Sequence, residues 1–290
     1  MISGNLTPEF LQSLEPLLID FHTHTTASDG ALSPSQLLLR AAERGVEALA
    51  LTDHDTLSGW QAAQALQADN ITIVCGAELS CQWGGATIHV VGLNVNANSE
   101  TLVGMLEHLQ QLRRDRAEKI GAKLEQLGAP GALAGAQALA GEAAICRPHF
   151  AHWLVAEGYM PTVSRAFDKW LGNGKPGDIK TLWPSLAETV AVIVAAGGVP
   201  VLAHPLKYRF TRTKLRAMCD AFSSAGGAAI EIVNGRQSDS EVVALRRLAK
   251  DKNLMVSLGS DFHREWAHGA DLGVDTSIAG DGAGVWEMIL

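Results

Sequence analysis

The chain has 290 residues, 47% of them hydrophobic and 19% charged, which excludes global disorder and allows a substantial buried core. No apolar run reaches the roughly 18 residues of a membrane span, and the first eighteen residues lack the basic start of a secretory signal. The net charge of −8 argues against a broad nucleic-acid-binding surface. It does not exclude a nucleotide substrate, because metal ions can reverse the charge of a single cleft.

Seven short apolar runs predict buried strands, which we interpret as parallel. They are Leu17–Phe21, Val46–Leu51, Ile71–Cys75, Thr87–Gly92, Val199–Ala203, Ala228–Val233 and Leu254–Leu258. Helical stretches fall between many of them, one opened by Ser33-Pro34 and another over Leu186–Ala196. This alternation favours an α/β fold, and seven strands favour closure into a barrel.

The segment 100–178 interrupts this rhythm, because it contains no predicted strand. Thr101–Leu127 is a long helical pattern, Pro130–Ala144 is rich in alanine and glycine, and Pro148–Glu157 predicts a further helix. We expect residues 100–178 to form a helical insertion, a lid or substrate subdomain, on a barrel made of 19–99 and 179–290. Residues 1–18 would be an N-terminal extension.

A basic cluster on the long helical pattern is interleaved with Asp115 and Glu118, which is typical of a solvated helix face. Its members are Arg113, Arg114, Arg116 and Lys119.

The four cysteines, Cys75, Cys81, Cys146 and Cys219, form no C-x-x-C pair. This indicates a reducing, cytoplasmic protein without a disulfide framework or a two-thiol zinc site.

Histidines and carboxylates gather where the predicted strands end. His22 and His24 close the first strand two positions apart, so their side chains point the same way. Asp29, in a turn-like loop, can bring a carboxylate back to the same point. The carboxyl ends of barrel strands are where such folds build active sites, and neutral imidazole is a common metal ligand.

The later strands add to this set. His54, Glu78 and His204 follow the second, third and fifth strands, and Asp261 and His263 follow the seventh. His89 lies within the fourth strand, where a lone histidine is more often a hydrogen-bonded core residue.

The resulting ligand pool has nine members, too many for one ion at three to four protein ligands each, and therefore suits two or three. They are His22, His24, Asp29, His54, Glu78, His89, His204, Asp261 and His263. Three divalent ions would outweigh the three carboxylates, so the site would attract an anion such as a phosphate. Asp53, next to His54, is a candidate for orienting a ligand imidazole from outside the metal centre.

These motifs resemble those of the polymerase and histidinol phosphatase (PHP) family. The resemblance implies a distorted (β/α)7 barrel and a multi-metal phosphoesterase site. Within the family, the segments 18–31, 76–93, 130–155 and 172–177 are most similar to bacterial ribonuclease AM and the 3′,5′-nucleoside bisphosphate phosphatases. The nine pool residues match that subfamily's three-metal pattern, which implies two or three divalent ions, Mn²⁺ first, with Fe²⁺ or Zn²⁺ as alternatives.

The implied activity is removal of the 3′-phosphate from bisphosphates such as 3′-phosphoadenosine 5′-phosphate, and 5′-to-3′ release of mononucleotides from short single-stranded RNA. Arg147 and Lys175 match the insertion's phosphate-binding, catalytic pair. Lys207 is a further candidate substrate contact, and His149 is either a substrate contact or a packed helix residue. The chain departs from the subfamily pattern at Leu206-Lys207-Tyr208 and at Arg264-Glu265-Trp266. Lys207 replaces an arginine there and lacks its bidentate fork.

Two alternatives remain open at this stage. One is a phosphatase of a small non-nucleotide metabolite such as histidinol phosphate, against which the insertion with Arg147 and Lys175 argues. The other is an inactive module that binds metal or nucleic acid, against which the intact ligand pool argues. No membrane contact and no required protein partner are expected.

Overall fold

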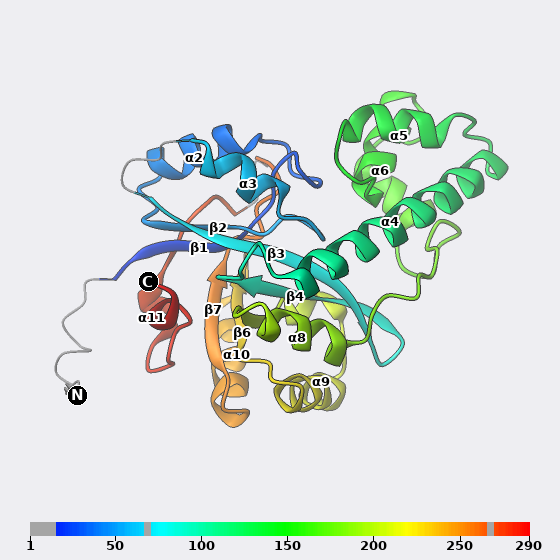
Figure 1. Cartoon of the computed structure of the whole chain (residues 1–290). Coiled ribbons are helices and arrows are strands. Elements are labelled where there is room, and N and C mark those ends of the chain that lie inside the picture. The colour runs from blue at the N-terminus through cyan, green and yellow to red at the C-terminus, as the bar shows by residue number, and fades with distance from the viewer. Residues whose placement is uncertain (1–15, 67–70, 266–269) are drawn as a thin grey trace, which may run out of the picture.

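The computed structural model describes residues 16–66, 71–265 and 270–290. Most of the predicted N-terminal extension and Trp266 lie outside these ranges. The described chain forms an eight-stranded sheet in the order β7-β6-β5-β4-β3-β2-β1-β8 that curls into a nearly closed barrel (Figure 1). The strands are β1 (Leu18–Thr23), β2 (Ala48–Leu51), β3 (Thr72–Trp83), β4 (Ala86–Leu93), β5 (Val199–Leu202), β6 (Ala229–Asn234), β7 (Met255–Gly259) and β8 (Val274–Asp275).

The barrel closes where β1 meets the end of β7. The Asp261 N–H donates to the His22 carbonyl at 2.8 Å, and the His24 N–H donates to the Phe262 carbonyl at 2.9 Å. Glycine at position 259 permits this approach, because a Cβ there would lie 2.5 Å from the Cβ of His22. Two of the predicted ligand-bearing segments therefore touch directly.

The predicted α/β barrel is confirmed, and all seven predicted strands are present. The expectation that they are parallel is wrong for β4, which runs antiparallel to both β3 and β5. A strand buried on both faces reads as a continuous apolar run in either direction, so the pattern does not reveal this reversal. The reversal brings the first half of β4, with His89, to the end of the barrel where β5 terminates.

Helices cover the barrel strands, and their starts follow local capping chemistry. The Ser33 side chain and Gln36 form a reciprocal capping box with Pro34 in the first turn, which confirms the helix start predicted there. Ser185 and Glu188 do the same for α8. The covering helices are α2 (Pro34–Glu43), α3 (Ser58–Gln64), α8 (Leu186–Ala195), α9 (Arg212–Ser224) and α10 (Asp239–Asp251), with short turns η2 (Pro205–Tyr208), η3 (Thr276–Ala279) and α11 (Trp286–Ile289).

The segment between β4 and α8 is helical and builds an apolar core of its own. Figure 1 shows α4 leading away from the barrel to a group of helices that includes α5 and α6. The elements are α4 (Glu100–Gln126), α5 (Ala132–Ala140), α6 (Arg147–Ala156), α7 (Val163–Ala166) and the π-helical turn η1 (Phe167–Leu171). Their buried cluster, which includes Leu124, Phe150 and Leu154, is separate from the barrel core. The exact boundaries at 99/100 and 178/179 stay a prediction.

The four cysteines are buried and free. Within the described ranges, no helix combines the length and apolar character needed to span a membrane.

The basic cluster on α4 is not a uniformly solvated face, so that interpretation is wrong for two of its members. Arg113 is buried, and its Nε donates to Asp55 Oδ2 at 2.5 Å. Its Nη2 donates to Ser80 Oγ at 2.9 Å, so Arg113 ties α4 to the barrel. Arg116 is half-buried beside a pocket, whereas Arg114 is exposed as expected.

Replacing Arg113 with methionine is expected to destabilise the fold by about 3–5 kcal/mol, because the buried Asp55 carboxylate loses its counter-charge. The measurement is the midpoint of urea unfolding. Arg114→Met, one residue along the same helix, is the matched control and should change stability by less than about 0.5 kcal/mol. Equal midpoints for the two variants would contradict the structural role of Arg113.

Candidate active site

All nine pool residues converge at one end of the barrel. Their ligand atoms form four overlapping groups, each with all its atoms within 4.8 Å of one another. The groups are His24, Asp29, His54 and His263; His22, Glu78 and His204; His22, His24 and Asp261; and His54, Glu78 and His89.

Glu78 lies at the centre of this cluster. Its Oε1 lies 2.7 Å from His204 Nε2 and 2.8 Å from His89 Nδ1. Its Oε2 lies 2.8 Å from His54 Nδ1 and 3.4 Å from His24 Nε2. Glu78 is fully buried within β3, which continues for five residues past it. A single carboxylate therefore bridges imidazoles from four different segments.

The other two carboxylates complete the cluster from opposite sides. Asp29 Oδ1 lies 3.4 Å from His263 Nε2 and 3.8 Å from His54 Nε2. Asp261 Oδ1 lies 3.4 Å from His24 Nε2.

Asp261 and His204 both have positive φ angles, 53° and 29°, a conformation that non-glycine residues rarely adopt. Such strain is typical of functional sites.

The donor set fits divalent metal ions. Within the part of the chain that the structure describes, three buried atoms of the cluster, Asp29 Oδ1, His54 Nδ1 and Glu78 Oε2, lie close to other ligand atoms but meet no hydrogen-bond geometry. Buried polar atoms are normally paired, so these atoms lack a partner that a cation would supply. Imidazole and carboxylate without thiolate suit manganese, iron or zinc.

The charge states of His24, His89 and Glu78 fit metal binding, whereas neighbouring carboxylates raise the pKa of His22 and that of His263, the latter to about 9. Burial lowers the pKa of His24 to about 3 and that of His89 to about 4, which keeps both imidazoles neutral. Burial opposes ionisation of Glu78, but His89 and His54 nevertheless hold its pKa well below the usual range. Neutral imidazole and ionised carboxylate are the forms that bind metals.

Glu231 is a site residue that the sequence interpretation missed. Its Oε1 lies 2.5 Å from His22 Nδ1, and its Oε2 accepts the backbone N–H of His204 at 2.6 Å. This contact leaves His22 Nε2 free to face the cluster, 3.1 Å from His24 Nε2. The available signal was a single glutamate in the middle of the apolar run of β6.

Replacing Glu231 with glutamine is expected to weaken metal binding about 10- to 100-fold, the usual cost of losing a partner of a ligand histidine. Equilibrium dialysis against Mn²⁺ measures this directly. Wild-type affinity in the variant would show that Glu231 does not orient His22.

The hydrogen bonds of Asp53 go to the loop between His24 and Asp29 rather than to a histidine ring. It accepts hydrogen bonds from the Thr25 N–H at 2.7 Å, the Thr25 hydroxyl at 2.8 Å and the Ser28 hydroxyl at 2.6 Å. Ser28 Oγ in turn lies 3.4 Å from His24 Nδ1. Asp53 therefore holds the loop between His24 and Asp29 in place.

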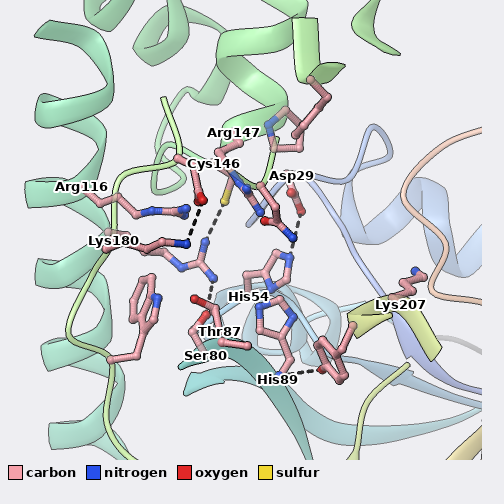
Figure 2. A pocket seen from close by; sticks show the side chains of 18 of the residues that line it. Asp29, His54, Ser80, Thr87, His89, Arg116, Cys146, Arg147, Lys180 and Lys207 are labelled. Carbon is pink, nitrogen blue, oxygen red and sulfur yellow. Dashed lines mark hydrogen bonds and ion pairs between the residues drawn. The ribbon is translucent and has the colours of Figure 1, made fainter. Parts of the chain in front are cut away.

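A basic pocket of about 510 Å³ opens beside the cluster. Figure 2 shows His54 and His89 on one side and Arg116, Arg147 and Lys180 on the other. Arg116 comes from α4, and Arg147 begins α6. The helical segment thus supplies the basic wall, and the barrel supplies the cluster.

The two arginines are poorly neutralised. The Arg116 Nε donates to the Ile179 carbonyl and the Arg147 Nη1 to the Leu171 carbonyl. Across the described ranges, neither has a carboxylate oxygen within 4.0 Å. Burial and the neighbouring Arg147 lower the pKa of Arg116 to about 10, and burial also lowers the pKa of Arg147. Two guanidinium groups that form no direct ion pair favour an anion, although Asp178, itself paired with Lys180, also lines this pocket.

The other candidate substrate contacts have different outcomes. Lys175 is exposed and does not line the pocket, whereas Arg116 and Lys180 do, so its role as the partner of Arg147 stays a prediction. The His149 Nδ1 accepts the backbone N–H of Cys146 at 2.9 Å, which caps α6. Lys207 borders the pocket and forms an ion pair with Asp261.

Comparison with known proteins gives consistent matches over most of the chain. The PHP domain family model matches residues 20–171. A 5′-3′ exoribonuclease of Haemophilus influenzae is 38% identical over 271 residues, covering 92% of this chain and 97% of that protein. A 3′,5′-nucleoside bisphosphate phosphatase of Chromobacterium violaceum is 38% identical over 257 residues, covering 88% and 90%. A solved structure of an amidohydrolase from Chromobacterium violaceum, with bound sulfate and no metal, superposes with a TM-score of 0.85 at 36% identity, covering 93% and 95% of the two chains.

Proposed function

Because this chain belongs to the PHP domain family, we propose that it is a metal-dependent phosphoesterase that hydrolyses the ester on the 3′-oxygen of a 5′-phosphorylated nucleotide. With a 3′,5′-nucleoside bisphosphate, the products are a 5′-nucleotide and phosphate. With a short single-stranded RNA, the same bond cleavage releases the 5′-terminal mononucleotide. In both cases water adds across the P–O3′ bond, and the 3′-oxygen leaves with a proton.

The observation that carries this proposal is the pairing of the ligand cluster with a second anion site. Arg116 and Arg147 face the same pocket as His54 and His89. A pocket of about 510 Å³ is in the range of small-ligand sites. A nucleotide with phosphates on both sides of its ribose matches one phosphate to each wall.

The nine pool residues would hold two or three divalent ions, Mn²⁺ first. Such ions supply Lewis-acid chemistry, because they lower the pKa of a bound water and neutralise charge on a phosphate. The donor set supports divalent ions as the cofactor.

Three basic side chains of this protein bind the two phosphates of the substrate. Arg116 and Arg147 donate hydrogen bonds to the 5′-phosphate and thereby set the distance between it and the cluster. Lys207, which forms an ion pair with Asp261 at the cluster, contacts the 3′-phosphate that is cleaved; this ion pair is the support for that role. The helical segment acts as the substrate subdomain, because it carries both arginines.

Product analysis tests the proposal. Manganese-loaded protein receives 3′-phosphoadenosine 5′-phosphate and, in parallel, a short 5′-phosphorylated RNA. The proposal predicts AMP and phosphate from the first and stepwise 5′-mononucleotides from the second. Turnover of histidinol phosphate, with neither nucleotide substrate cleaved, would contradict it.

A further inference from the structure

A second pocket, of about 660 Å³, also borders the cluster. It shares Asp29 and Lys207 with the first pocket but also reaches Asp261 and His263, and it lacks Arg116. Phe167 borders both pockets. The two pockets therefore border the same ligand cluster with largely different linings.

The second pocket holds a buried hydrogen-bond donor with no partner. Asn234 ends β6 and is 3% exposed, and its Nδ2 makes no hydrogen bond within the described residues. The orientation of this amide follows from its neighbour. Gln237 Oε1 accepts the Asn234 N–H at 3.0 Å, so Gln237 Nε2 must be the group that donates to Asn234 Oδ1 at 2.6 Å. The Asn234 NH₂ group is thereby turned away from Gln237, and Asn234 is one of the residues that line the pocket.

The wall beyond Asn234 is cationic. Arg236 and Arg264 line the pocket together with Lys207. Among these three, only Lys207 forms an ion pair in the described part of the chain. A buried amide donor flanked by unpaired guanidinium groups suits a ligand with phosphate and sugar oxygens.

The proposed reaction explains why a second pocket is needed for only one of the two substrates. A bisphosphate ends at the phosphate that is cleaved, whereas RNA continues beyond it to the next ribose. If the 5′-terminal nucleotide occupies the Arg116–Arg147 pocket, the continuing chain must leave the cluster on another side.

We propose that the second pocket receives the nucleotide that follows the cleaved phosphate of RNA, with the Asn234 NH₂ group donating to it and Arg236 contacting its next phosphate. This inference rests on the proposed function and adds to it the residues that select RNA over free bisphosphates. Asn234 and Arg236 are specificity residues, because neither belongs to the ligand cluster.

The test compares kcat/KM for a 5′-phosphorylated trinucleotide with kcat/KM for the 3′,5′-bisphosphate in the full-length, manganese-loaded protein. In Asn234→Ala and in Arg236→Ala, we expect the trinucleotide-to-bisphosphate ratio to fall about tenfold, the effect of one lost hydrogen bond. Arg236 is exposed, so its substitution does not put folding at risk. Arg114→Ala, an exposed arginine that lines neither pocket, is the matched control and should leave the ratio unchanged.

A ratio that stays at the wild-type value in both variants would overturn the inference, as would an equal loss on both substrates. Wild-type protein that cleaves the bisphosphate but not the trinucleotide would also overturn it, while the bisphosphate phosphatase half of the proposed function would stand. Wild-type protein that cleaves neither would instead refute the proposed function itself.

Discussion

Glu78→Gln is expected to abolish hydrolysis and to release the bound metal. Glu78 bridges His54, His89 and His204 through its two carboxylate oxygens, at 2.7–2.8 Å. Glutamine has nearly the same size but no charge, and it turns an NH₂ donor toward imidazole nitrogens that must stay free to bind a cation. The loss of activity should exceed the ~10²-fold seen when only an outer partner of a ligand is removed.

Metal content and kcat are measured on the same preparation, so that loss of metal and loss of rate can be compared directly. Asp261→Ala should behave in the same way, since Asp261 belongs to the same cluster. Glu107→Gln, on the exposed face of α4, is the control for a generic loss of negative charge. Full metal content together with wild-type turnover in Glu78→Gln would refute the assignment of the cluster.

Arg147→Ala is expected to separate substrate recognition from metal binding. Arg147 lines the pocket, donates to the Leu171 carbonyl and lies outside the ligand cluster, so the variant should keep its metal. Hydrogen bonds to charged groups contribute about 1.5–3 kcal/mol, which predicts a fall in kcat/KM of about 10- to 150-fold on the bisphosphate.

The decisive control for Arg147→Ala is a second substrate that lacks the 5′-phosphate. A nucleoside 3′-monophosphate has no 5′-phosphate, so Arg147→Ala should change its hydrolysis little. Arg147→Lys should recover part of the loss, because lysine keeps the charge but not the two-pronged geometry. Metal loss in Arg147→Ala, or an equal fall on both substrates, would contradict the role assigned to Arg147.

The parts of the site that the sequence predicts well are those governed by strand periodicity. His22 and His24 must share a face because they are two residues apart at the end of a strand, and Asp261 and His263 repeat that spacing. The carboxyl ends of parallel strands meet at one end of a barrel, so the sequence predicts that motifs at different strand ends share one site. The structure brings all nine of these side chains together.

The parts of the site that the sequence predicts poorly depend on strand direction and on long-range packing. His89 joins the cluster because β4 runs antiparallel, and an apolar run carries no sign of direction. Arg113 and Arg116 lie on a helix whose acidic neighbours suggest solvation, and only docking of α4 against Asp55 and the pocket shows otherwise. The role of Lys175, which lies exposed and lines neither pocket, stays a prediction.

The central claim is that Arg116 and Arg147 recognise a 5′-phosphate on the nucleotide whose 3′-ester is cleaved at the cluster. The most direct test is the ratio of wild-type kcat/KM values for a 3′,5′-bisphosphate and for the matching nucleoside 3′-monophosphate. Two charge-assisted contacts predict a preference of at least about 10²-fold for the bisphosphate. Equal kcat/KM values for the two compounds would contradict the claim.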